Sequence, residues 1–152
     1  MNSRKGQAAL DFLMTYGWAI ALVVIIAAVL FALGVFDVSN FVGNKASGFS
    51  GVAVAGWQMS SAGVLTMKLS NQVGQQIRID SVNVTVGQSS GAASPAVTLS
   101  TGATTDYITV NMVNATGLTP GAGYTAKVTI GYTDLNANFP YVTSGTLTGK
   151  VV

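Results

Sequence analysis

The chain of 152 residues offers few side chains that could do acid–base or nucleophilic chemistry. It contains no His, no Cys and no Glu, so all five acidic residues are Asp and no thiolate or imidazole is available to a metal. A general base would have to be Asp or Lys, and the Asp residues beyond the first third of the chain occur singly at turn-like positions. No Ser has an identifiable base. The sequence therefore argues against an enzyme and predicts neither a metal site nor a cofactor.

Residues 134–138, Asp-Leu-Asn-Ala-Asn, imitate the first half of a calcium-binding loop. The glycine that such a loop needs next is replaced by Phe139, and the chain has no Glu to act as the bidentate ligand. A hairpin turn that uses Asp and Asn side chains to bind its own backbone is the favoured interpretation.

Two sequons could accept N-linked glycans, Asn83-Val-Thr85 and Asn114-Ala-Thr116. Asn83 alternates with two valines, so we expect its side chain to face solvent. Asn114 begins a segment rich in Gly, Thr and Pro, which predicts a turn. Both asparagines are therefore candidate glycosylation sites of an exterior protein.

The charge distribution argues against nucleic-acid binding. The formal net charge is +2 and only 8% of the residues are charged. Two of the seven cations, Arg4 and Lys5, precede a long hydrophobic run, and the other five are scattered without forming a basic stripe.

That hydrophobic run extends from Phe12 to Phe36 without a charged residue. As a helix it would be about 37 Å long, enough to cross a hydrocarbon core of about 30 Å. Cations lie only on its N-terminal side, which predicts a cytoplasmic N-terminus and an exterior location for residues 38–152. The run is longer than the core of an ordinary secretory signal peptide, so conventional signal-peptidase cleavage is disfavoured.

The composition of the run differs from that of a helix that faces only lipid. Gly17 and Ala21 form one pair of small residues four apart, and Ala28 and Ala32 form another; such pairs let helix backbones approach closely. Asp11 lies at the start of the run, where an unpaired carboxylate is costly. These features predict packing against other helices.

The N-terminal segment resembles that of archaeal type IV pilins with a class III signal peptide. The resemblance covers about 30 residues and comprises Arg4-Lys5-Gly6, Gln7 through Phe12, and the apolar helix that follows. It implies that a prepilin peptidase cuts between Gly6 and Gln7, and that Asp11, fifth in the mature chain where Glu is more usual, pairs with the new terminal amine of an adjacent subunit. The alternative for Asp11 is a membrane-interface position near the helix N-terminus, where negative charge is favoured.

The remainder of the chain is patterned for β-structure. Apolar residues alternate with polar ones around Leu65, Ile108, Tyr124 and Leu147, and the phase of alternation changes near Asp80-Ser81, which predicts a bulge. Residues 87–106 are small and polar and predict a long loop around one short strand at 96–99. About seven strands are expected, arranged as an antiparallel β-sandwich of Ig-like size.

The predicted fold class is therefore α+β, a long hydrophobic helix followed by a β-sandwich head. The predicted organisation is a basic leader at 1–6, a helix at 7–45, a linker at 46–52 and the head at 53–152. The favoured function is a structural subunit of a surface filament for adhesion, membrane-inserted before assembly, whose partners are other copies, the prepilin peptidase and the assembly machinery. Two alternatives remain: a single-pass membrane protein with an exterior binding module, and a subunit of the archaellum, whose helices usually begin with more Gly and Ile.

Overall fold

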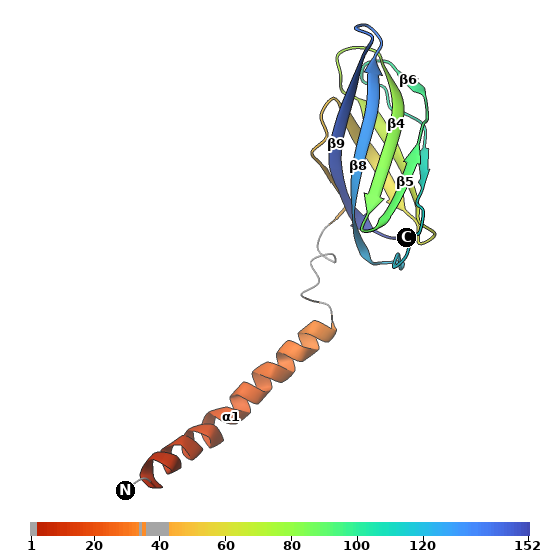
Figure 1. Ribbon diagram of the computed structural model, residues 1–152. Coiled ribbons are helices and arrows are strands. Elements are labelled where there is room, and N and C mark those ends of the chain that lie inside the picture. Colours follow the sequence, from red (N-terminus) through yellow and green to blue (C-terminus); the bar gives the residue numbers. More distant parts are fainter. Residues whose placement is uncertain (1–2, 34, 36–42) are drawn as a thin grey trace. The chain divides into compact units, whose positions relative to one another are not determined.

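The computed structural model describes residues 3–33, 35 and 43–152, and its contacts divide the chain into a unit that ends at Asn40 and a unit that begins at Phe41. The first unit contains helix α1 (Ser3–Ala32), and the second unit, the head, has nine strands among its described residues (Figure 1). The α+β class is confirmed in this form: one apolar helix followed by antiparallel sheets.

Helix α1 is continuous over 30 residues and has no acidic residue in its first turn and no basic residue in its last. Its stretch Lys5–Ala32 is long and apolar enough to cross a membrane, with a mean hydropathy of 2.4 and none of the tested window buried within the structure. Beyond Ala32, the amide of Leu33 donates to the carbonyl of Val29 (2.9 Å) and the helix ends. A glycine follows Leu33 in the sequence, the residue type most common just after a helix.

The predicted boundaries between helix, linker and head need correction. The helix was expected to run from residue 7 to residue 45, but α1 begins at Ser3, and Lys45 already belongs to strand β1 (Lys45–Ser47). The predicted linker 46–52 holds the rest of β1 and Val52, the first residue of strand β2. Local sequence could not reveal β1, because its three residues are all exposed and its only partner is a strand about 100 residues later, through pairs such as Lys45 with Thr148. Residue 34 and residues 36–42 of the predicted helix lie outside the described residues.

The head contains two antiparallel sheets. The larger has the order β1-β9-β8-β4-β5, with β6 also paired to β4, and the smaller has the order β2-β3-β7. The remaining strands are β2 (Val52–Met59), β3 (Val64–Asn71), β4 (Ile77–Val86), β5 (Ser89–Ala93), β6 (Val97–Leu99), β7 (Ile108–Asn111), β8 (Gly123–Asp134) and β9 (Phe139–Lys150). Figure 1 shows β9, β8, β4 and β5 side by side in the larger sheet.

One hydrophobic core joins the two sheets. Alternate residues of β3 (Leu65, Met67, Leu69) are completely buried and belong to the same cluster as the buried alternate residues of β8. Residues on the other faces of these strands are mostly Thr, Lys and Ser and are more exposed, as the period of two predicts. Every fully buried side chain of this cluster comes from residues 52–151, so the described head forms a core of its own.

The phase change predicted near Asp80-Ser81 is confirmed as a register shift between Ile79 and Ser81, where β4 pairs with β8. The shift keeps Ile79 and Val82 both buried. The short strand predicted at 96–99 is confirmed as β6.

The expected long loop at 87–106 is wrong in its first part, because residues 89–93 form β5, and the expected number of strands is too low. Strand β5 follows β4 after the two residues Gly87 and Gln88, with Val86 opposite Ser89. Gly87 has a φ of 57°, the conformation that favours glycine at the first position of a tight hairpin turn. The Val-Gly-Gln-Ser tetrapeptide was therefore the signal for β5. The small residues of β5 (Ser, Gly and Ala) concealed a strand that pairs with the C-terminal half of β4.

Candidate functional site

Residues Gly6 to Ala32 of α1 hold the predicted cleavage and assembly positions. The Gly6–Gln7 bond lies inside the helix, which continues without interruption from Ser3. Gln7 and Asp11 are four residues apart and therefore neighbours on the helix surface, and both are exposed. The structure thus places the predicted N-terminal residue and the predicted carboxylate on the same side of the helix.

The four small residues also share one side of the helix, which we call the small-residue face (Gly17, Ala21, Ala28, Ala32). At about 100° per residue they fall within about 60° of one another around the axis. Beside Gly17 there is open space, because a Cβ placed there would meet no atom within 4 Å. Gln7 and Asp11 lie on the flank of the same face, at about 80° and 120° from Gly17.

The side of α1 opposite the small-residue face is bulkier. Phe12 and Tyr16 lie there and their rings touch, with centroids 4.8 Å apart. The hydroxyl of Thr15 donates a hydrogen bond of 2.8 Å to the carbonyl oxygen of Asp11, so this hydroxyl already has a partner within the helix. At these positions, the side with the four small residues admits a closer neighbour than the side with the aromatic pair.

Large apolar side chains are exposed along the whole of α1. They include Leu10, Phe12, Met14, Trp18, Val23 and Phe31, with exposed fractions between 59% and 81%. Among the side chains that the structure describes, which exclude that of Arg4, no cation lies within ion-pairing distance of the Asp11 carboxylate. A contiguous apolar surface of this length marks a membrane or protein interface in a folded protein.

Both predicted glycosylation sites are accessible in the head. Asn83 is exposed in β4, between the buried Val82 and Val84, as the alternation predicted. Asn114 is exposed in a turn with a φ of 57°, and its carbonyl oxygen accepts a hydrogen bond of 2.8 Å from the Ser89 hydroxyl. Asn83 is paired on both edges, with Ala92 and with Thr129, so an enzyme could reach its backbone only before the sheet forms.

The segment that imitates a calcium loop is a hairpin turn between β8 and β9. One carboxylate oxygen of Asp134 accepts hydrogen bonds from the amides of Asn136 (2.8 Å) and Ala137 (3.2 Å), and Asn138 has a φ of 50°. The turn interpretation is therefore confirmed. Across the residues that the structure describes, no group of three or more carboxylate-type ligands gathers in one place.

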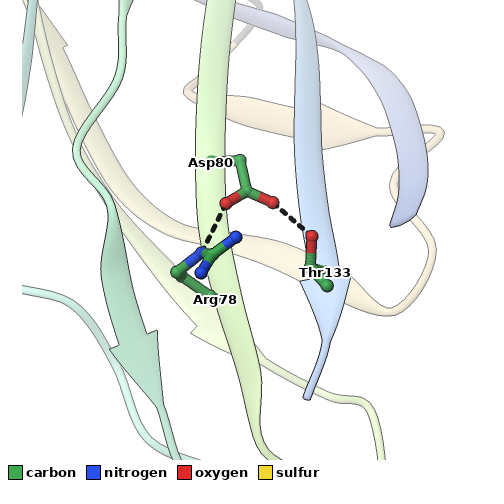
Figure 2. A network of polar contacts seen from close by, with 3 residues as sticks. All are labelled: Arg78, Asp80 and Thr133. Atoms are coloured by element: carbon green, nitrogen blue, oxygen red, sulfur yellow. Dashed lines mark hydrogen bonds and ion pairs between the residues drawn. The ribbon is translucent and has the colours of Figure 1, made fainter. Parts of the chain in front are cut away.

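A polar network at the bulge of β4 joins it to β8, and sequence reasoning did not predict it. Figure 2 shows the Asp80 carboxylate between Arg78, whose Nε lies 2.6 Å from it, and the hydroxyl of Thr133, which donates to its other oxygen. The Thr133 hydrogen bond, followed by Arg78, lowers the pKa of Asp80 below its usual value of 3.8. The Thr133 hydrogen bond links β8 to β4 where the bulge interrupts their regular pairing, and the Arg78 contact holds the Asp80 carboxylate within β4.

The lowered pKa predicts a small, pH-dependent contribution to stability. A carboxyl whose pKa falls on folding stabilises the folded state above its unfolded pKa, and that contribution is lost as the pH falls through the lower, folded value. We expect Asp80→Asn to lower the free energy of unfolding by less than about 1 kcal/mol at pH 7, because both partners are partly exposed. In urea titrations this difference should disappear below the pKa of Asp80. A difference that persists at low pH would contradict the charge-based account.

No family model matches the chain and no curated protein matches it, so a functional assignment depends on the residues and geometry described above.

Proposed function

We propose that the chain is a pilin-type structural subunit of a surface filament, assembled through α1 and displaying the head outside the cell. The observation that carries the proposal is the unburied apolar surface of α1 together with Asp11, the one carboxylate in the sequence of α1, which has no ion-pair partner among the described side chains. In a monomer such a surface is stable only in a bilayer. Packing of several copies of the helix would remove this apolar surface from lipid and give Asp11 a partner.

The processing step supplies that partner. Cleavage after Gly6 would make the α-amine of Gln7 the first group of the chain, and such an amine is a cation at neutral pH. An amine and a carboxylate from adjacent copies attract strongly in a low-dielectric helix bundle, and each relieves the desolvation cost of the other. Assembly would then depend on cleavage. The prepilin peptidase and the assembly machinery are the partners that this proposal requires.

The proposed head is an Ig-like β-sandwich. The core shared by the two sheets supports this arrangement, because side chains of β3 and β8 join one buried cluster. The hydroxyl-rich exposed faces of the strands and the accessible Asn83 and Asn114 suit an exterior surface that carries glycans. We propose that this surface mediates adhesion.

The small-residue face provides a matched test of helix packing. We expect Ala21→Leu to reduce the amount of sheared, sedimentable filament at least about tenfold, because the larger side chain holds neighbouring backbones apart. Ala19 lies about 200° from Gly17 around the axis, so Ala19→Leu adds the same bulk on the opposite side and should leave filament yield within about twofold. Immunoblots of membrane and sheared fractions check both variants. Equal loss with the two variants, at equal membrane levels, would contradict packing through this face.

A second candidate is a single-pass membrane protein whose head is an exterior binding module. The unbroken helix through the Gly6–Gln7 bond favours it, because a peptidase must unwind that segment before it can cut. In that case residues 1–6 stay attached and α1 faces lipid alone.

A further inference from the structure

The smaller sheet carries an exposed aromatic side chain between two hollows. Tyr107, just before β7, is 72% exposed and lines both of them. The first hollow is about 270 Å³ and is lined also by Gly56, Trp57, Gln58, Thr66 and Lys68. The second is about 320 Å³ and is lined also by residues 93–95, 97 and 105–109, among them Pro95, Asp106 and Thr109.

The register of the smaller sheet explains the first hollow. Thr66 and Lys68 alternate with buried residues of β3, so they lie on the face turned away from the core, opposite Gln58 and Gly56 of β2. Gly56 supplies no side chain there, and a Cβ added to it would meet no atom within 4 Å. The gap opposite Lys68 is therefore open to a ligand.

Lys68 also positions the aromatic ring. Its ammonium nitrogen lies 4.4 Å from the centroid of the Tyr107 ring, a cation–π contact. An exposed ring that is already held in place loses less conformational entropy when a ligand stacks on it. Tyr107 is thus a preorganised platform although most of its surface meets solvent.

The charges around the platform indicate what kind of ligand it would take. Lys68 borders the first hollow and Asp106 borders the second, so an ion long enough to span both hollows beside Tyr107 would meet a like charge in one of them. A neutral ligand with many hydroxyl groups can accept from Lys68 and Gln58 and donate to Asp106. The apolar face of a sugar ring can stack on Tyr107.

We propose that Tyr107 and the two hollows beside it form a binding site for neutral hexose oligosaccharides. The site extends the proposed adhesive function by giving the head a ligand class. It rests on that proposal only in requiring an exterior head, since binding by a single subunit does not need polymerisation.

Trp57 gives the test a built-in reporter, because it lines the first hollow and the only other tryptophan is Trp18 of α1. The full chain carrying Trp18→Phe would be kept in a detergent without a sugar head group and titrated with maltohexaose, cellohexaose and mannotriose. We expect a saturable change in Trp57 emission with at least one of them, with a Kd of about 1 mM. Tyr107→Ala should weaken that binding at least about tenfold, whereas Tyr107→Phe, which keeps the ring, should stay within about threefold.

Phe139→Ala controls for the loss of any exposed aromatic residue, because Phe139 is 57% exposed on β9 and lines neither hollow. It should leave binding unchanged, and denaturant unfolding should show that all three variants remain folded. No saturable response to any of the three sugars, or an equal response in Tyr107→Ala, would overturn the proposal. The proposal would also be overturned if Trp57 emission changed with protein concentration in the absence of sugar. That result would indicate that a second copy of the chain binds this face. The assay uses the unassembled subunit, so its outcome is separate from that of filament assembly.

Discussion

Asp11→Ala is expected to reduce surface filament at least about 100-fold while leaving the amount of membrane-inserted subunit unchanged. Removing one partner of a buried ion pair costs about 3–5 kcal/mol, because the other charge is left without compensation. In a filament this cost would recur at every subunit, so the effect on assembly should be severe. Quantitative immunoblots of sheared and membrane fractions, with electron microscopy of the cell surface, measure it.

Two matched variants separate charge from shape at this position. Asp11→Glu keeps the charge on a chain one methylene longer and should restore filaments to within about threefold of the parent. Asp11→Asn keeps the shape and removes the charge, and should behave like Asp11→Ala. Normal filaments from Asp11→Asn would favour the alternative interpretation, in which Asp11 only occupies the membrane interface near the start of the helix.

Asn71→Ala is expected to be the most destabilising polar substitution in the head. Asn71 is completely buried at the end of β3. Its amide nitrogen donates to the carbonyl oxygens of Gln75 (2.8 Å) and Ser100 (3.1 Å), and its side-chain oxygen accepts from the amide of Val73 (2.9 Å). The side chain therefore joins the turn after β3 to the segment after β6.

Alanine at position 71 would leave several of these backbone groups buried without partners, at about 1–3 kcal/mol for each. We expect a total loss of about 2–4 kcal/mol in the free energy of unfolding. Denaturant titrations of the full chain in the Trp18→Phe background, followed by Trp57 emission, would measure the loss. Asn111→Ala is the matched control, because Asn111 is exposed on β7 and should change stability by less than about 0.5 kcal/mol. A similar small change for Asn71→Ala would contradict the account of this cluster.

The features that the sequence predicted well depend on local patterns. A charge-free apolar run as long as residues 12–36 indicates a helix, and alternation around Leu65 or Tyr124 indicates strands with one buried face. The shift in phase near Asp80 even located the bulge of β4. Each of these signals lies within one continuous stretch of the sequence.

The features that were missed depend on which strands become neighbours. Strand β1 forms only because the far end of the chain supplies β9, and β5 forms along β4 although its own residues are small and polar. The hollows beside Tyr107 exist because β7 pairs with β3, which brings Tyr107 next to Lys68, 39 positions earlier in the sequence. Such contacts have no signature within either segment alone.

The candidate assembly site was likewise predicted from the sequence only in part. Sequence spacing was enough to place the small residues and Asp11 along one helix, and the structure adds that the four small residues share a face with Gln7 and Asp11 on its flank. The proposed partner of Asp11 belongs to another copy after cleavage, so no property of one uncut chain can supply it.

The most direct test of the filament proposal is the N-terminal peptide and intact mass of the chain in material sheared from the cell surface. The proposal predicts a sedimenting fraction in which the chain begins at Gln7, with added glycan mass if Asn83 or Asn114 is modified. A chain that keeps Met1 to Gly6, stays in the membrane fraction and releases nothing on shearing would contradict it and identify an anchored exterior module instead.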